Sequence, residues 1–128
     1  MTRIAIIAAL AFGFASAAHA GEGYMCEGEG VTAHFPLGAS IGLSLLGAEI
    51  EAGGEKYATD TVAGATEIAV SQAMADGNRI AIDFTDPSYE TLVAKVRLFW
   101  AEEESDPVYG GILSIAGKGA WAIACSVG

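Results

Sequence analysis

Apolar and polar residues alternate along much of this 128-residue chain, and this period of two constrains the fold more than any other feature. In residues 79–84, for example, every second residue is large and apolar: Ile80, Ile82 and Phe84. Successive side chains of a β-strand point to opposite faces of a sheet, so a segment of this kind buries one face and exposes the other. The alternation therefore predicts strands.

Two turn sequences join alternating segments into predicted hairpins. The Asp-Gly-Asn sequence at 76–78 follows an alternating segment at 67–72 and precedes the one at 79–84. The Gly-Lys-Gly sequence at 117–119 divides residues 113–125 in the same way. Short turns that contain Gly and Asn between alternating segments are typical of antiparallel hairpins.

A long strand is predicted at 92–100, with two basic residues on its outer face. Its inward set is Leu92, Ala94, Val96, Leu98 and Trp100. Lys95 and Arg97 then point outward, and we expect each to face a carboxylate on a neighbouring strand, such as Asp83, because opposite charges across a sheet stabilise it. The alternative is an anion-binding spot beside an exposed Phe99.

The first half of the chain is less regular. A strand is expected at 31–35, ended by Pro36, and short strands at 41–46, 49–51 and 55–59. A helix over 39–51 is the alternative, but its two internal glycines would cost about 1 kcal/mol each relative to Ala. The whole pattern predicts an all-β domain, a small antiparallel barrel or sandwich of about seven to eight strands.

The first twenty residues have the features of a secretory signal peptide. Arg3 supplies a positive start, an uncharged apolar stretch follows at 4–17, and Ala18-His19-Ala20 places small residues at the cleavage site. The apolar stretch is shorter than the roughly 20 residues of a membrane-spanning helix. We expect residues 1–20 to be removed, no membrane span to remain, and residues 21–128 to form one domain in the periplasm or outside the cell.

The chain has two cysteines, Cys26 and Cys125, near the two ends of the expected domain. In an exported protein such a pair predicts a disulfide. The alternatives are two free thiols or a metal site, but a metal site would need further ligands at suitable spacing. A disulfide here would close almost the whole domain into one loop and place its first and last strands side by side.

The charge balance is strongly acidic. The chain has 16 acidic and 6 basic residues, and residues 1–20 contain one of the bases and no acid, so the rest has a formal charge of -11. Nucleic-acid binding is not expected, because phosphate contacts depend on Lys and Arg. A basic protein is the partner that such a field would attract and steer.

Catalytic and metal-binding residues are poorly represented. His34 is the single histidine of residues 21–128, and its place on a predicted strand indicates a structural role more than that of a general base. Two acidic clusters occur, one with Glu22, Glu27 and Glu29 and one formed by Glu102, Glu103, Glu104 and Asp106. Neither has the spacing of a calcium loop, and calcium binding there stays open; solvated loops are the simpler interpretation. We expect no enzyme activity and no cofactor.

Several short motifs resemble the periplasmic inhibitors of C-type lysozyme. Tyr24-Met25-Cys26 and the segment at 31–35 resemble that family's opening strand. The Gly54-Glu55-Lys56-Tyr57 sequence resembles its G-x-[RK]-Y segment, and Phe99-Trp100 and Lys118-Gly119 resemble its later F-W and K-G elements. The family's inhibitory loop has Ser where this chain has Gly53, and an acidic insertion separates the last two motifs here.

The resemblance implies a small β-barrel and, with the acidic charge, a non-enzymatic module that binds a basic protein such as lysozyme. The partner-binding residues it points to, together with the second acidic cluster, are Gly53, Gly54, Lys56, Tyr57, Glu102, Glu103 and Glu104. Two alternatives stay open: a small barrel that carries an apolar ligand, and a structural envelope protein with no small ligand. The oligomeric state and the strand order do not follow from the sequence.

Overall fold

The computed structural model describes residues 22–38, 43–104 and 107–128, and the predicted signal peptide lies outside them. Ten strands form one sheet. They are β1 (Gly23–Gly28), β2 (Val31–Pro36), β3 (Glu49–Ala52), β4 (Glu55–Ala58), β5 (Ala65–Glu67), β6 (Ala69–Asp76), β7 (Arg79–Thr85), β8 (Leu92–Ala101), β9 (Val108–Ile115) and β10 (Gly119–Val127). In these ranges the chain has no helix, and so none long and apolar enough to cross a membrane.

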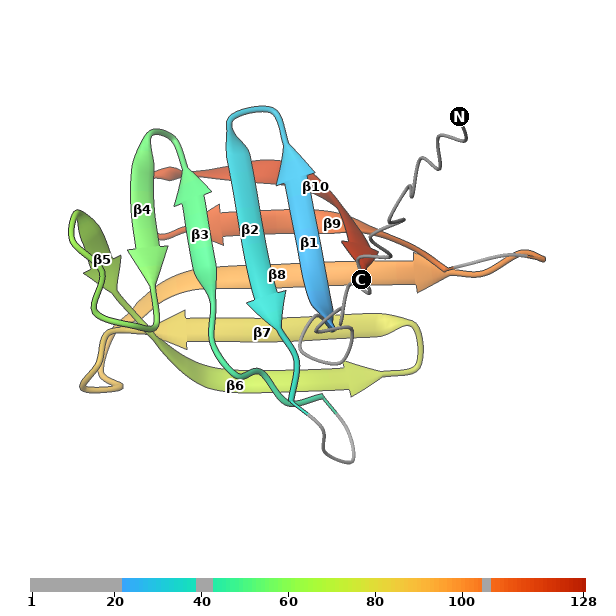
Figure 1. The fold of residues 1–128 in the computed structure, drawn as a ribbon, viewed down its shortest axis with the longest axis horizontal. Helices are drawn as coiled ribbons and strands as arrows, with labels where there is room; N and C mark the ends of the chain where they lie inside the picture. Colours follow the sequence, from blue (N-terminus) through green and yellow to red (C-terminus); the bar gives the residue numbers. More distant parts are fainter. Residues whose placement is uncertain (1–21, 39–42, 105–106) are drawn as a thin grey trace, which may run out of the picture.

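The strands are arranged in the order β5-β4-β3-β2-β1-β10-β9-β8-β7-β6. Every neighbouring pair is antiparallel except β4 and β5, which are parallel. Figure 1 shows β1–β5 as one layer and β6–β10 as a second layer whose strands cross behind the first. The two margins of the sheet, β5 and β6, are consecutive in the chain with only Ile68 between them. The sheet therefore curls into a nearly closed barrel, as the sequence pattern predicts.

The number of strands is ten rather than the seven or eight expected. Alternation did not predict β1, because its apolar residues Tyr24, Met25 and Cys26 are consecutive. It also did not predict β5, which has only three residues. The strand expected at 41–46 is not formed: residues 41–42 lie outside the described part, and Leu45 makes only an isolated bridge to Leu37.

The alternating residues fill the space between the two layers. Phe35 from β2 and Phe84 from β7 are fully buried and stack with ring centroids 5.8 Å apart. The other largest buried side chains are Ile68, Ile82, Val96, Leu98 and Leu113. Burial of side chains of this size stabilises the fold by roughly 1.5–3 kcal/mol each. The predicted inward residues of β8 are confirmed for Ala94, Val96 and Leu98, which are buried. The prediction is wrong for Leu92, which is 41% exposed beside the β7–β8 loop.

Both predicted hairpins are present. Gly77, with φ of 59°, and Asn78 form the turn between β6 and β7, and β9 and β10 are joined through Gly117, with φ of 74°. The β6–β7 ladder contains one irregularity, a bulge at Ser71 between Val70 and Gln72. From Gln72 onward the two strands pair regularly up to the turn.

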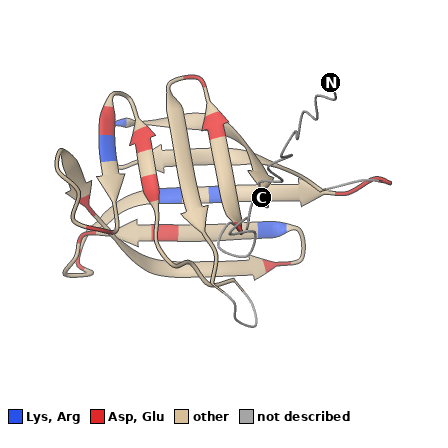
Figure 2. Ribbon diagram, viewed as in Figure 1, with Lys and Arg blue, Asp and Glu red and all other residues tan. Residues whose placement is uncertain are grey.

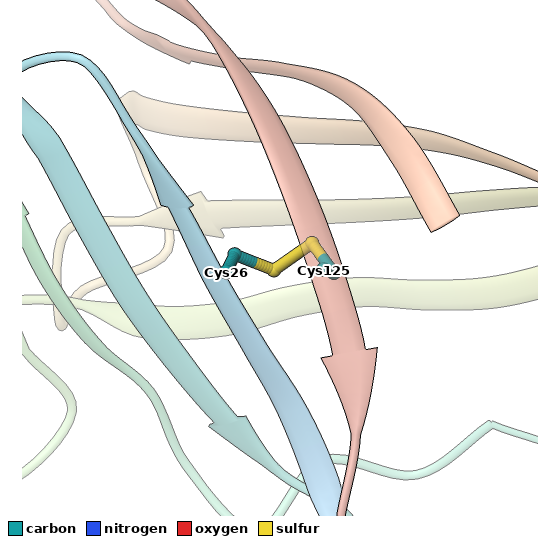
Figure 3. The surroundings of a disulfide bond; sticks show 2 residues. All are labelled: Cys26 and Cys125. Carbon is teal, nitrogen blue, oxygen red and sulfur yellow. A yellow bond between two sulfur atoms is a disulfide. The ribbon is translucent and has the colours of Figure 1, made fainter. Parts of the chain in front are cut away.

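Cys26 and Cys125 form the predicted disulfide, shown in Figure 3. They face each other directly across β1 and β10, with Cα atoms 4.0 Å apart and a sequence separation of 99 residues. Both side chains are at least nine-tenths buried. The bond thus joins the first and last strands at the junction between the two halves of the sheet.

The expectation for the two basic residues of β8 is confirmed for Arg97. Its Nη1 lies 2.8 Å from Asp83 Oδ1 and donates hydrogen bonds to the carbonyls of Val96 (2.9 Å) and Ile82 (3.3 Å). Lys95 stands opposite Asp83 in the strand register, yet it forms no ion pair with any carboxylate of the described residues. The Asp83 carboxylate therefore pairs with Arg97, its diagonal neighbour on β8, because the longer guanidinium side chain can reach it.

Replacing both cysteines, in Cys26→Ala/Cys125→Ala, should lower the free energy of unfolding by about 2–5 kcal/mol, because the bond restricts the unfolded chain over a very long loop. Denaturant unfolding monitored by tryptophan fluorescence measures this change. The parent protein should show no free thiol on titration without reductant. An unfolding free energy equal to that of the parent would contradict the structural role of the bond.

Arg97→Gln should destabilise the protein by about 0.2–1 kcal/mol more than Lys95→Gln, although both substitutions remove one positive charge, because only the first breaks an ion pair. Thermal unfolding at low and high salt measures the difference, which should shrink as screening increases. Combining Asp83→Asn with each variant completes a double-mutant cycle, which gives the interaction energy of each basic residue with Asp83. Equal losses for the two single variants would show that the ion pair adds no stability.

Candidate functional site

An open groove of about 670 Å³ runs over the outer face of the β1–β5 layer. Its floor consists of side chains that the strand register sets side by side in two rows. One row contains Met25, His34 and Glu49, and the other contains Glu27, Thr32, Glu51 and Lys56. Neighbouring strands lie about 4.8 Å apart, so the members of each row are within contact range of a single ligand segment.

The groove is acidic. Glu27, Glu49 and Glu51 project from its floor against one ammonium group, that of Lys56. In Figure 2 the ribbons of β1 and β3 are red at their acidic residues. Fixed carboxylates in a concave surface favour a cationic ligand, because the field of several like charges adds up there. Among the described residues, no three His, Cys, Asp or Glu side chains are grouped as metal ligands.

His34 lies in this groove, partly buried, opposite Met25 on one side and Glu49 on the other. Within the described residues it has no hydrogen bond to a Ser, Thr or Cys side chain. A nucleophile activated by a histidine requires such a contact. His34 is one of the side chains that line the groove.

The predicted partner-binding residues Gly53 and Gly54 form a tight two-residue turn between β3 and β4. Their φ angles are 61° and 82°, values that favour glycine. A Cβ atom at residue 53 would also lie 3.2 Å from Cζ2 of Trp121, which packs over this turn. A side chain at residue 53 would therefore meet both an unfavourable φ and the indole ring.

Lys56 and Tyr57 are neighbours that point in opposite directions. Lys56 is exposed at the groove, whereas Tyr57 is 5% exposed and its ring lies in the core. The Tyr57 hydroxyl donates a 2.8 Å hydrogen bond to Glu55, whose other oxygen accepts one of 3.1 Å from Lys118 Nζ. Burial, followed by the hydrogen bond to Glu55 and its charge, raises the pKa of Tyr57 to about 12. Tyr57 is therefore a structural residue, and Lys56 is the one accessible to a partner.

A second depression of about 690 Å³ lies at this end of the barrel, between β4–β5 and the β9–β10 turn. Gly54, Lys56 and Tyr57 line it together with the ion pair of Glu55 and Lys118, whose Nζ and Oε1 atoms are 3.1 Å apart. The hydrogen bonds from Tyr57 and Lys118 and the ammonium charge lower the pKa of Glu55. Because its charged groups already pair with one another, this depression offers a partner less uncompensated charge than the groove does.

The second predicted cluster, Glu102, Glu103 and Glu104, lies elsewhere. These exposed residues begin the β8–β9 connection, and Figure 1 shows the chain extending away from the barrel just beyond β8. The strand register places this connection at the end of the barrel opposite the Gly53-Gly54 turn. Asp106 lies outside the described residues. The two groups of predicted residues therefore do not form one site.

The groove itself was missed by the sequence analysis. The alternation of Glu49 and Glu51 around Ile50 does indicate two carboxylates on one face of a strand. Their proximity to Glu27 depends on the pairing of β1 with β2 and of β2 with β3, which no local pattern reveals. In the sequence, Glu27 stands with Glu22 and Glu29 as a solvated cluster.

An exposed Phe99 was one alternative from the sequence, but the apolar surface strip that it forms with residues of β9 was not expected. Phe99 and Ile112 are each 53% exposed and Val108 is 71% exposed, all on the outer face. The Arg79 guanidinium lies 5.6 Å from the centre of the Phe99 ring, within cation–π range. This strip borders the acidic β8–β9 connection, so that end of the barrel is a second surface that could contact a protein.

No protein-family model, curated protein or solved structure matches this chain. The geometry and charge of these surfaces are therefore the basis for assigning a function.

Tyr57→Phe should flatten the loss of stability at alkaline pH. The folded-state pKa of about 12 lies above the ordinary value of 10.0. The neutral phenol therefore stabilises the fold fully below about pH 10, and this stabilisation is lost as the pH rises to about 12. Denaturant unfolding across this window measures the effect. Tyr89→Phe, at a side chain that is 65% exposed, is the control and should leave the alkaline loss unchanged. The same steep loss in Tyr57→Phe would contradict the assignment.

Proposed function

We propose that this protein is an exported, non-enzymatic binding module that engages a basic protein, such as a lysozyme, through the acidic groove of the β1–β5 layer. The observation that carries the proposal is the set of carboxylates Glu27, Glu49 and Glu51 on one concave face, opposed by a single lysine. These groups come from β1 and β3, and the strand ladders fix where their side chains leave the backbone. The backbone of the surface therefore needs no ordering when a partner binds.

Electrostatics would act on both the rate and the specificity of such binding. With residues 1–20 removed the chain has a formal charge of -11, since one of its 6 bases and none of its 16 acids lie there. This field attracts cationic proteins from a distance and accelerates their association at low salt. The groove then provides local complementarity, because exposed lysine or arginine side chains of the partner can each approach a carboxylate. Binding should accordingly weaken as the ionic strength rises.

The resemblance to lysozyme inhibitors supports the choice of partner, but the mode of engagement differs from the one it implies. The turn formed by Gly53 and Gly54 is short and packed against Trp121, and it has no hydroxyl to offer an enzyme cleft. We therefore assign the contact to the carboxylates of the groove. Of the predicted site, Lys56 and Tyr57 line the groove, and Lys56 is the exposed one of the two.

The two alternatives have less support. A carrier of an apolar ligand would need room inside the barrel, and Phe35, Phe84 and Ile82 are fully buried there between the layers. Small barrels commonly fill their interiors with side chains in this way. A purely structural envelope protein would not need the groove to bind a basic protein. Binding experiments with groove variants therefore distinguish this alternative from the proposal.

The test is the binding of lysozyme to the protein without its predicted signal peptide, measured by calorimetry at low and high salt. Glu49→Gln/Glu51→Gln should weaken binding at low salt on the order of tenfold, since two close charge contacts are lost. The matched control, Glu102→Gln/Glu103→Gln, removes the same charge from exposed residues outside the groove and should have a much smaller effect.

Three results would overturn the proposal in different ways. Absence of binding to lysozyme and to a second basic protein at low ionic strength would rule out the module. Binding of the second basic protein alone would remove lysozyme as the partner. Equal weakening by the groove and control variants would show that the overall field, rather than the groove, is responsible.

A further inference from the structure

The strand β6 has a ladder on one side only. In the described part of the chain it pairs with β7 and with no other strand, and it ends the strand order of the sheet. In Figure 1 it forms the lower margin of the β6–β10 layer. Edge strands of this kind present unpaired N–H and C=O groups that can pair with another chain.

The residues that direct their backbone groups toward this free edge follow from the β6–β7 hairpin. The two-residue turn makes Asp76 and Arg79 a hydrogen-bonded pair, and such pairs alternate along an antiparallel ladder. Gln72 and Met74 then also bond to β7. Ala73 and Ala75 occupy the positions between them, so their N–H and C=O groups point away from β7.

The edge lacks features that usually prevent pairing. Proteins protect edges with lysine, proline, bulges or very short strands. The bulge at Ser71 affects only the beginning of β6, and residues 72–76 are regular. This regular segment contains no Pro or Lys, and Asp76 is its one ionisable residue.

We propose that a second copy of this chain pairs with the free edge of β6 in antiparallel orientation, about a two-fold axis at Met74. In this register Ala73 of each copy bonds to Ala75 of the other, which uses all the outward backbone groups of the regular segment. An interface of this kind is the same on both copies, as closed two-fold symmetry requires.

The side chains on the outer face are complementary in the same register. Gln72 of one copy stands opposite Asp76 of the other, so its amide can donate a hydrogen bond to that carboxylate. Met74, which is 48% exposed, meets its own counterpart at the axis. Shifting the register by two residues would lose the Gln72–Asp76 match and extend the pairing into the bulge or the turn. These contacts select a second copy as the occupant of the edge.

Sedimentation velocity over a wide concentration range tests the association. We expect a monomer–dimer equilibrium that added salt strengthens, because screening reduces repulsion between two strongly acidic copies. Ala75→Pro removes an N–H from the free edge without removing a bond to β7. It should weaken dimerisation on the order of tenfold, since two symmetry-related hydrogen bonds are lost, while the melting temperature of the monomer changes little.

Cysteine cross-linking tests the register independently of that variant. Met74→Cys should give a disulfide-linked dimer, because directly opposite Cβ atoms in a sheet lie about 4.5–5.5 Å apart. Gln72→Cys is the matched control and should not cross-link to itself, since its counterpart is displaced by about 13 Å along the strands. A mixture of Gln72→Cys and Asp76→Cys should cross-link to each other.

The proposal is overturned if the protein remains a monomer at every concentration and Met74→Cys gives no linked dimer. It is also overturned if Gln72→Cys links to itself as readily as Met74→Cys, which would indicate another register or random collision. Dimerisation unaffected by Ala75→Pro would place the interface elsewhere, for example on the apolar strip of Phe99 and Ile112. Capture of a different protein at the β6 edge without self-association would refute the second copy as occupant.

Discussion

The pairing of β1 with β10 is the contact on which the rest of the barrel depends. In the strand order, it is the ladder that joins the five N-terminal strands to the five C-terminal ones. Every other neighbouring pair lies within one half of the chain. The Cys26–Cys125 bond is placed in the middle of this ladder. Without the β1–β10 ladder, the two layers would be connected only by the chain around Ile68 and by their packed faces. Forming this ladder closes a loop of nearly the whole domain, which is costly in entropy.

The strongly acidic surface makes this covalent closure more important. A net charge far from zero favours expansion of the chain through self-repulsion, and few of the carboxylates are neutralised by direct contacts. Within the described residues, ion pairs link Arg97 to Asp83 and Lys118 to Glu55, at 2.8 and 3.1 Å. The apolar core and the disulfide must therefore offset the repulsion between carboxylates. Glu27, Glu49 and Glu51 form no ion pair with described residues. Carboxylates without partners of their own can interact with another protein.

The fold could be predicted from the sequence to the extent that it depends on local patterns. Alternation at 79–84 and the Asp-Gly-Asn turn were sufficient for the β6–β7 hairpin. The disulfide was predicted from the expected export together with the even number and the positions of the cysteines. The groove could not be predicted, because the proximity of Glu27 to Glu51 depends on two successive strand registers. The inward position of Tyr57 was missed for a similar reason: the motif around it gives its neighbours in sequence, whereas the side chains that bury it come from the sheet.

The free edge of β6 follows from the way the barrel closes. β5 pairs with β4 on one side of the sheet, and β6, which begins two residues after β5 ends, pairs with β7 on the other. One continuous segment thus supplies both margins of the sheet, and it changes partner at the buried Ile68. Beyond that point β4 has ended at Ala58, so its short ladder cannot extend along β6. The length of β4 therefore sets how much of β6 is left unpaired, and a barrel with a longer β4 could close the same edge within one chain.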